Sequence, residues 1–181
     1  MISLKSSITK KILNYFFINP HESLYVNELS RKLALDKRNL VKKMRELESE
    51  GILAHQIRGN LKLYHINMKH PFYKEYRKII LSTVGLEGRL KALLQGMGKI
   101  KEVYIYGSYA KDAMDAHSDI DLLVVGDEGL SNIQRQFSML QKELDREINV
   151  ISMGEAEFKR KLREGDPFVG GILKGKHIRI I

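Results

Sequence analysis

The stretch GSYAKDAMDAHSDIDLLVV, residues 107–125, constrains the fold of this chain more than any other part of its sequence. Its end, DIDLLVV, has the apolar and β-branched composition of a buried strand, but the strand opens with Asp119 and Asp121. These aspartates are two residues apart, so both side chains point to the same face of the strand. Two carboxylates on one face repel each other unless a cation lies between them, and such oxygen ligands suit Mg²⁺ or Mn²⁺. The strand therefore predicts a divalent-metal site at its start.

The residues before this strand indicate a site for phosphate. VYIYGS is a β-branched and aromatic strand that ends in Gly107 and Ser108, and YAKDAM is expected to form a short helix. Gly107 lets the backbone approach an anion closely, Ser108 adds a hydroxyl near the helix cap, and the N–H groups of a helix N-terminus attract phosphate. A metal on the two aspartates would bridge to phosphates held here and would neutralise charge on a leaving pyrophosphate.

Gly-Ser, then ten residues, then Asp-x-Asp, in a strand–turn–helix–strand context, resembles the signature of the DNA polymerase beta-like nucleotidyltransferases. The resemblance is to their minimal nucleotidyltransferase branch. It implies that Gly107 and Ser108 hold the phosphates of an NTP and that Asp119 and Asp121 hold the metal. Lys111 matches a basic position common in the family, and it is either a phosphate ligand or a solvated lysine.

Many catalytic members of this family carry a third acidic residue on the next strand, expected here as INVISM. The corresponding position is Asn149, between two apolar residues. An amide can offer a carbonyl oxygen to a metal, but it has no charge and cannot act as a general base. The resemblance therefore implies a site that binds nucleotide and one metal with weakened transfer. Glu147, two residues earlier on the same face, could replace Asn149 if the register of the strand is shifted.

The basic excess of the chain lies in its first half. Residues 1–100 contain 19 Lys and Arg against 8 Asp and Glu, whereas residues 101–181 contain 12 against 14. This asymmetry indicates a half that meets a polyanion, joined to a half with another task. A merely soluble basic surface is the alternative.

Apolar periodicity predicts three helices in SSITKKILNYFFINP, SLYVNELSRKLAL and DKRNLVKKMRELESE, followed by a β-hairpin that turns at Gly59-Asn60. This order resembles a winged helix-turn-helix, and the hairpin spacing GxLxxxxxGxxxLYxIN resembles the wing of small bacterial and archaeal regulators. The helix at 36–50 would be the recognition helix that enters the major groove of DNA. The candidate DNA contacts on this helix and on the wing are Lys37, Arg38, Asn39, Lys42, Lys43, Arg45, Arg58, Asn60 and Lys62.

These features predict an α+β chain with a winged helix domain over 1–70, a helical connector over 71–97 and a small mixed α/β nucleotidyltransferase domain over 98–181. After INVISM, we expect a helix, a glycine-rich turn and a final short strand. We expect His117 to be an ordinary loop histidine. The absence of cysteine excludes disulfides and thiolate ligands, and no apolar stretch is long enough to span a bilayer, so we expect a cytoplasmic protein without membrane contact.

Three functions remain open. The first is an enzyme that transfers a nucleoside monophosphate from an NTP to an acceptor. The family resemblance implies that the acceptor is a small molecule such as an aminoglycoside, or a partner protein such as a HEPN-domain toxin. The second is a transcription regulator that binds DNA and uses the nucleotidyltransferase domain as a nucleotide sensor without catalysis. A winged helix that serves only to form a homodimer is a third option. The intact Gly-Ser and Asp-x-Asp favour the enzyme, whereas Asn149 and the basic half favour the regulator.

Overall fold

The computed structural model of the chain divides into two compact units, Met1–Gly88 and Arg89–Ile181. The division falls inside helix α5 (Leu86–Gln95). Among the described residues, no helix is both long enough and apolar enough to cross a membrane. The described parts of the chain are residues 4–95, 97–115, 118–127 and 129–181.

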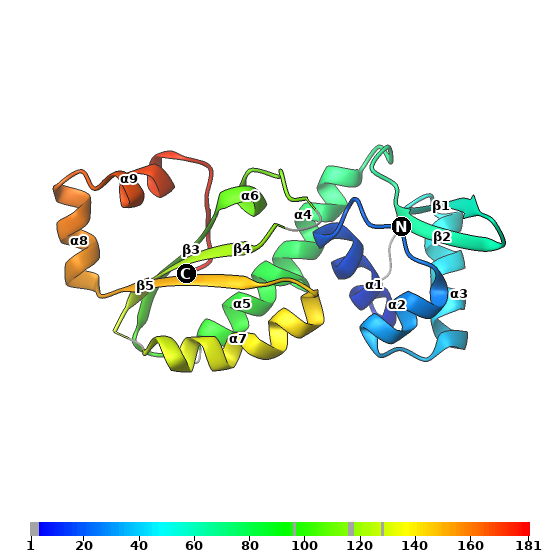
Figure 1. Cartoon of the computed structure of the whole chain (residues 1–181), viewed down its shortest axis with the longest axis horizontal. Helices are drawn as coiled ribbons and strands as arrows, with labels where there is room; N and C mark the ends of the chain where they lie inside the picture. Colours follow the sequence, from blue (N-terminus) through cyan, green and yellow to red (C-terminus); the bar gives the residue numbers. More distant parts are fainter. Residues whose placement is uncertain (1–3, 96, 116–117, 128) are drawn as a thin grey trace. The chain divides into compact units, whose positions relative to one another are not determined.

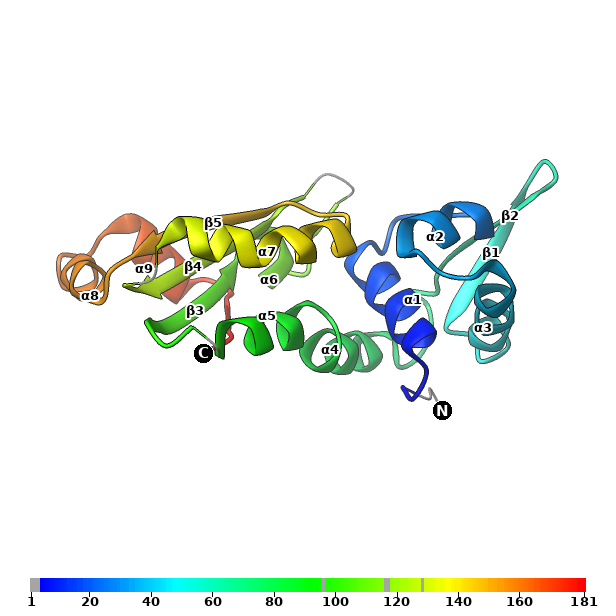
Figure 2. The same ribbon diagram turned by 90° about the horizontal axis from the view of Figure 1, so that it is seen from below.

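The first unit combines helices with an antiparallel β-hairpin (Figure 1). The hairpin turns at Gly59 and Asn60, because Arg58 pairs with Leu61 across it. The predicted order of three helices and a hairpin is confirmed, and the hairpin extends beyond the helices of its unit (Figure 2). The elements are α1 (Ser7–Ile18), α2 (Val26–Leu33), α3 (Lys37–Ser49), β1 (Leu53–Arg58), β2 (Leu61–Ile66) and α4 (Tyr73–Thr83).

Short polar side chains fix the starts of α1 and α3. The Thr9 amide donates to Oγ of Ser6 at 3.3 Å, and the Asn39 amide donates to Oδ1 of Asp36 at 3.0 Å. Such caps satisfy amides that have no partner inside the helix. Each helix turns its apolar stripe inward, and the fully buried apolar side chains of α1 and α3 include Ile12, Leu13, Phe16, Leu40 and Met44.

The second unit is a four-stranded sheet with helices on both faces (Figures 1 and 2). The strand order is β5-β4-β3-β6, with β4 parallel to β5 and β3 antiparallel to both β4 and β6. Helix α7 lies on one face, and α6, α8 and α9 lie on the other. The elements are β3 (Ile100–Tyr106), α6 (Gly107–Ala110), β4 (Ile120–Gly126), α7 (Leu130–Leu144), β5 (Ile148–Met153), α8 (Glu155–Arg163), α9 (Pro167–Lys174) and β6 (Ile178–Arg179).

One face of this sheet changes from apolar to polar along its strands. At one end, Leu123 and Val125 of β4 pack with Phe158 of α8 and with Val169 and Ile172 of α9. Because alternate residues of a strand share a face, Asp121 continues the same row toward the start of β4. The register aligns Asp121 with a residue of each neighbouring strand, Tyr106 of β3 and Asn149 of β5.

The short helix expected beside the Gly-Ser pair is present, but with other bounds than predicted. The helix expected over YAKDAM is a single turn that begins at Gly107 and ends at Ala110, and Asp112 just beyond it has a left-handed φ of +59°. This backbone conformation cannot continue a right-handed helix. At the other end of the helix, Tyr106 occupies the cap position, so Ser108 lies inside the helical turn.

The glycine-rich turn expected near the end of the chain is instead helix α9. Oδ1 of Asp166 accepts from the amides of Phe168 at 3.0 Å and Val169 at 2.9 Å, and Pro167 occupies the first helical position. A capping aspartate followed by proline starts a helix, and burial of Val169 and Ile172 offsets the weak helix propensity of glycine. His117 lies outside the described residues.

Candidate functional site

Gly107 and Asp121 meet where β3 ends. Gly107 has a φ of +72°, and a β-carbon at this position would lie 2.2 Å from Oδ2 of Asp121. Any larger residue would therefore be strained and would collide with the carboxylate. Ser108 follows with a half-buried side chain, and Lys111 is exposed at the end of the turn. The structure thus brings the Gly-Ser pair against the second aspartate of Asp-x-Asp.

Asn149 contacts the first aspartate of the pair. Its Nδ2 donates to Oδ2 of Asp119 at 3.1 Å, and its backbone is in register with Asp121. Glu147 precedes β5, and its carbonyl accepts from the Ile120 amide at 2.9 Å. The shifted register that would have aligned Glu147 with the aspartates does not occur, so an amide lies beside them.

Burial and mutual repulsion raise the free energy of the charged site. Burial raises the pKa of Asp121, the hydrogen bond from Asn149 opposes this, and the charge of Asp119 raises it further. Burial also raises the pKa of Tyr106, and the charge of Asp121 adds to this effect. Because Asp121 is partly buried and is repelled by Asp119, the two carboxylates are expected to attract a cation.

The donor set fits a hard divalent cation. Mg²⁺ is commonly held by one or two carboxylates together with water and substrate phosphates, and Asp119 and Asp121 would supply the carboxylates here. Within the parts of the chain that are described, no cluster of three or more His, Cys, Asp and Glu has the geometry of a metal site. The two aspartates would therefore need phosphate or water to complete the coordination.

Arg146 supports the loop that leads into Asp119. Its side chain is only 7% exposed, and its Nη1 donates to the carbonyl of Ser118 at 2.8 Å. Oγ of Ser118 in turn donates to Oδ1 of Asp115 at 2.8 Å. Arg146 has no distinguishing signal in the sequence, because an arginine between a helix and a strand has the pattern of an ordinary solvated residue.

A pocket of about 280 Å³ adjoins the carboxylate site. Gly107 and Lys111 line it on one side, and α9 contributes most of the other residues. The rings of Tyr106 and Phe168 meet edge to face with centroids 5.9 Å apart. No pattern in the sequence indicates this pocket, because the residues of α9 predict a turn and not a helix. The lining residues are Tyr106, Gly107, Lys111, Pro167, Phe168, Gly171, Ile172, Gly175 and Lys176.

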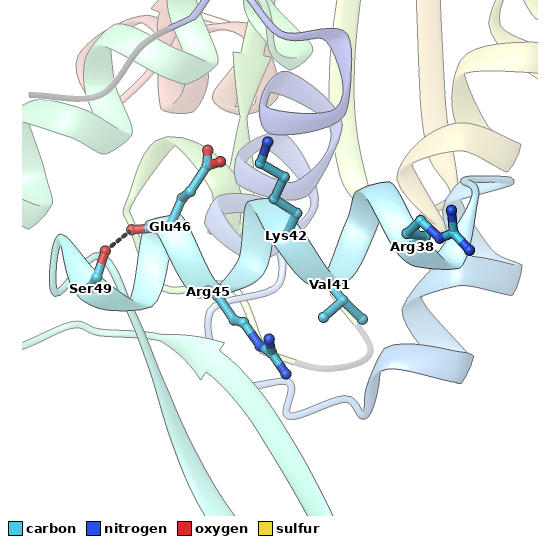
Figure 3. Close-up of a pocket in the computed structure, with 6 residues that line it drawn as sticks. All are labelled: Arg38, Val41, Lys42, Arg45, Glu46 and Ser49. Atoms are coloured by element: carbon cyan, nitrogen blue, oxygen red, sulfur yellow. Dashed lines mark hydrogen bonds between the residues drawn. The ribbon is translucent and has the colours of Figure 1, made fainter.

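A second candidate surface lies on α3 in the first unit (Figure 3). Arg38, Lys42 and Arg45 are exposed there, around a depression of about 520 Å³ whose lining residues all belong to α3. Lys37 and Asn39 are also exposed, at the start of the same helix. The structure thus gathers most of the basic candidates of this helix on its solvent side.

Two of the candidate DNA contacts are engaged with carboxylates. Nζ of Lys43 lies 2.6 Å from Glu46, and Nζ of Lys62 lies 2.9 Å from Glu48. The hydrogen bond to Glu48 raises the pKa of Lys62, and the same carboxylate contacts His55 of β1. Glu48 therefore ties the hairpin to α3, whereas the exposed Arg58 and Asn60 lie at the turn of the hairpin.

The second unit has the fold and the residue pattern of a nucleotide-transferring domain. Residues 86–176, half of the chain, match the family model described as the nucleotidyltransferase domain. The chain therefore belongs to the nucleotidyltransferase domain family.

A more specific likeness is to a candidate protein adenylyltransferase of Methanocaldococcus jannaschii, with 34% identity over 65 residues. This match covers 36% of the chain and 65% of the length of that relative. Among solved structures, a variant of the toxin–antitoxin MntA-HpeT is 19% identical with a TM-score of 0.39, and a toxin–antitoxin with AMP-PNP is 21% identical with a TM-score of 0.38. Each covers 52% of this chain and 72% of the other, and at these TM-scores neither carries a functional argument.

Proposed function

We propose that the second unit transfers a nucleoside monophosphate from an NTP to an acceptor hydroxyl, with Mg²⁺ or Mn²⁺ on Asp119 and Asp121. The observation that carries this proposal is the contact of Gly107 with the carboxylate of Asp121. Because this contact places the Gly-Ser turn against the carboxylate of Asp121, phosphates bound at the turn would lie beside a cation bound to the aspartates. Family membership of residues 86–176 supports the same reaction class.

In this reaction, the acceptor oxygen forms a bond to the α-phosphorus, and the bond from that phosphorus to the bridging oxygen of the β-phosphate breaks. Pyrophosphate leaves with the electron pair. Gly107, Ser108 and Lys111 would hold the phosphates, and Asp119 and Asp121 would hold a cation that, when bound, would neutralise the developing charge. Asn149 cannot accept the hydroxyl proton, so the proton passes to water and transfer is expected to be slow.

A side chain of a partner protein is the acceptor that we favour. The relative from Methanocaldococcus jannaschii is named as a candidate protein adenylyltransferase, which makes ATP the first donor and a protein the first acceptor to test. The resemblance to minimal nucleotidyltransferases makes a HEPN-domain toxin a specific candidate partner.

A second proposal is a regulator whose first unit is a DNA-binding winged helix and whose second unit senses nucleotide without turnover. The exposed cluster of Arg38, Lys42 and Arg45 on the third helix supports DNA binding, since that helix enters the major groove in winged helix proteins. The amide of Asn149 at the position of the third acid supports sensing without catalysis. A winged helix that forms only a homodimer would leave this basic face without a role.

The test is incubation with each of the four α-³²P-labelled NTPs, with Mg²⁺ or Mn²⁺ and with candidate acceptor proteins. Label transfer that is lost in Asp119→Asn and Asp121→Asn, but kept in the control Asp127→Asn, supports the enzyme. Metal-dependent nucleotide binding without transfer, lost in the same two variants, supports the sensor. If neither binding nor transfer depends on the two aspartates, both proposals for the second unit are wrong.

A further inference from the structure

The pocket beside Gly107 combines apolar, aromatic and basic side chains. Phe168 is 37% exposed and meets the ring of Tyr106, and Ile172 lines the same pocket. Lys111 and Lys176 are both exposed lining residues. Aromatic and apolar walls suit a flat, weakly polar group, whereas the two ammonium groups suit an anion. A ligand that suits both the apolar walls and the two ammonium groups has an apolar ring and a negatively charged end.

The pocket is continuous with the carboxylate site. Gly107 lines the pocket and also borders Oδ2 of Asp121. Tyr106, another lining residue, is in register with Asp121 on the adjacent strand. The hydroxyl of Tyr106 is a hydrogen-bond donor and acceptor on this wall of the pocket. A ligand in the pocket would therefore place one end beside the proposed metal and phosphate site.

A glycine keeps the pocket open on the side of α9. Gly171 lines the pocket inside this helix, and a β-carbon at that position would meet no atom within 4 Å. Glycine in a helix is unfavourable relative to alanine, and packing inside the protein does not require it at this position. Gly170, its neighbour in α9, also has open space around a β-carbon, but it does not line the pocket.

On the basis of the transfer reaction proposed above, we propose that this pocket receives the base and ribose of the NTP, while Lys111 and Lys176 bind its phosphates. The volume of about 280 Å³ is close to the lower limit for small-molecule pockets, about 300 Å³, and suits a nucleoside better than a polypeptide. The proposal adds Tyr106, Phe168 and Lys176 to the nucleotide site and gives α9 a role in binding the donor.

The test is calorimetric titration of the full chain with Mg²⁺ and with either a non-hydrolysable ATP analogue or inorganic triphosphate. Phe168→Ala should weaken binding of the analogue about 10-fold and leave triphosphate binding unchanged, because only the base contacts the ring. Lys176→Ala should weaken binding of both ligands, whereas Lys174→Ala, on the same helix but outside the pocket, should weaken neither. Gly171→Leu should exclude the analogue but not triphosphate, and Gly170→Leu is the matched control.

Thermal melts of each variant separate lost binding from lost folding. If Asp121→Asn abolishes analogue binding but Phe168→Ala and Gly171→Leu leave it unchanged, the transfer reaction stands and the base lies elsewhere. Equal weakening of analogue and triphosphate by Phe168→Ala would also overturn the assignment of the base. If the unmodified chain binds neither ligand, the failure lies in the proposed function itself.

Discussion

A β-carbon at residue 107 would lie 2.2 Å from Oδ2 of Asp121, so the glycine and the carboxylate occupy adjoining space that no other residue could share without displacement. This contact joins the end of β3 to the start of β4. The geometry of the proposed metal and phosphate site therefore depends on a glycine, which has no side chain, at position 107.

Gly107→Ala should therefore displace the Asp121 side chain and abolish metal-dependent nucleotide binding. The left-handed φ of +72° adds strain, and we expect a loss of about 1–3 kcal/mol in the free energy of unfolding. Gly59→Ala is the control, since Gly59 also has positive φ but has open space around a β-carbon. Denaturant unfolding and calorimetry measure the two effects. Unchanged nucleotide binding by Gly107→Ala would contradict this role.

Asp121→Asn should stabilise the metal-free protein at neutral pH. Burial raises the folded pKa of Asp121 above its unfolded value, so the folded state binds more protons. The unmodified protein therefore loses stability as the pH rises from the pKa of Asp121 in the unfolded state to its pKa in the folded state. Below both values Asp121 is protonated and uncharged, so the stabilising effect of Asp121→Asn should vanish in acid. Thermal melts of the variant and of the unmodified chain across this pH range measure the difference in stability and show whether it has the expected sign.

Mg²⁺ or Mn²⁺ should stabilise the unmodified chain, because a cation relieves the repulsion between Asp119 and Asp121. Asp121→Asn should lose most of this stabilisation, and chelation with EDTA should reverse it in the unmodified chain. Melting temperatures with and without the ion provide the measurement. An equal response of the two proteins would argue against a metal on these aspartates.

Asn149→Asp should accelerate the transfer reaction that we propose for the second unit. The new carboxylate would lie beside Asp119, where Nδ2 of Asn149 is now 3.1 Å from Oδ2, and it could accept the proton of the acceptor hydroxyl. We expect a rate increase of about 100-fold, the lower end of what a positioned general base supplies. Label transfer is measured beside Asn149→Ala, which loses the hydrogen bond to Asp119 without adding charge. A rate for Asn149→Asp no higher than that of Asn149→Ala would refute the proton-acceptor role.

Arg146→Ala should lower the free energy of unfolding by about 1.5–3 kcal/mol, because a charged, buried donor to the Ser118 carbonyl is lost. The loop into Asp119 should loosen, so metal affinity should fall as well. Lys142→Ala, an exposed change on the preceding helix, should alter stability by less than about 0.5 kcal/mol. Chemical denaturation and metal titration test both parts. Retained metal affinity in a destabilised Arg146→Ala would limit this residue to a structural role.

Arg38→Ala and Arg45→Ala should each weaken DNA binding and reduce its salt slope by about 1, as expected when one phosphate contact is removed. Lys43→Ala should have a smaller effect, because Lys43 is paired with Glu46 at 2.6 Å. Lys74→Ala, an exposed lysine of α4, is the control. Gel shifts over a range of salt concentrations measure the slope. A slope that does not change in either arginine variant would remove the support for DNA binding by α3.

Local patterns were sufficient to predict most elements of both units. The apolar periodicity of α1 and α3 and the Gly59-Asn60 turn act over a few residues, and the structure confirms both. The glycines of α9 led to a wrong prediction, because the helix depends on the Asp166 cap and on burial of Val169 and Ile172. Intrinsic propensity is easily overridden by such packing.

The sequence by itself determined which chemical groups are available: two carboxylates on one strand face, a Gly-Ser pair ten residues earlier, and an amide on the next strand. Only the tertiary structure decided the register that puts Asn149 rather than Glu147 beside the aspartates. It also decided that Arg146 anchors the segment before Asp119 and that Phe168 and Lys176 line the same pocket as Gly107. These contacts join residues far apart in the chain, and they depend on how strands pair and helices pack, which no short pattern in the sequence encodes.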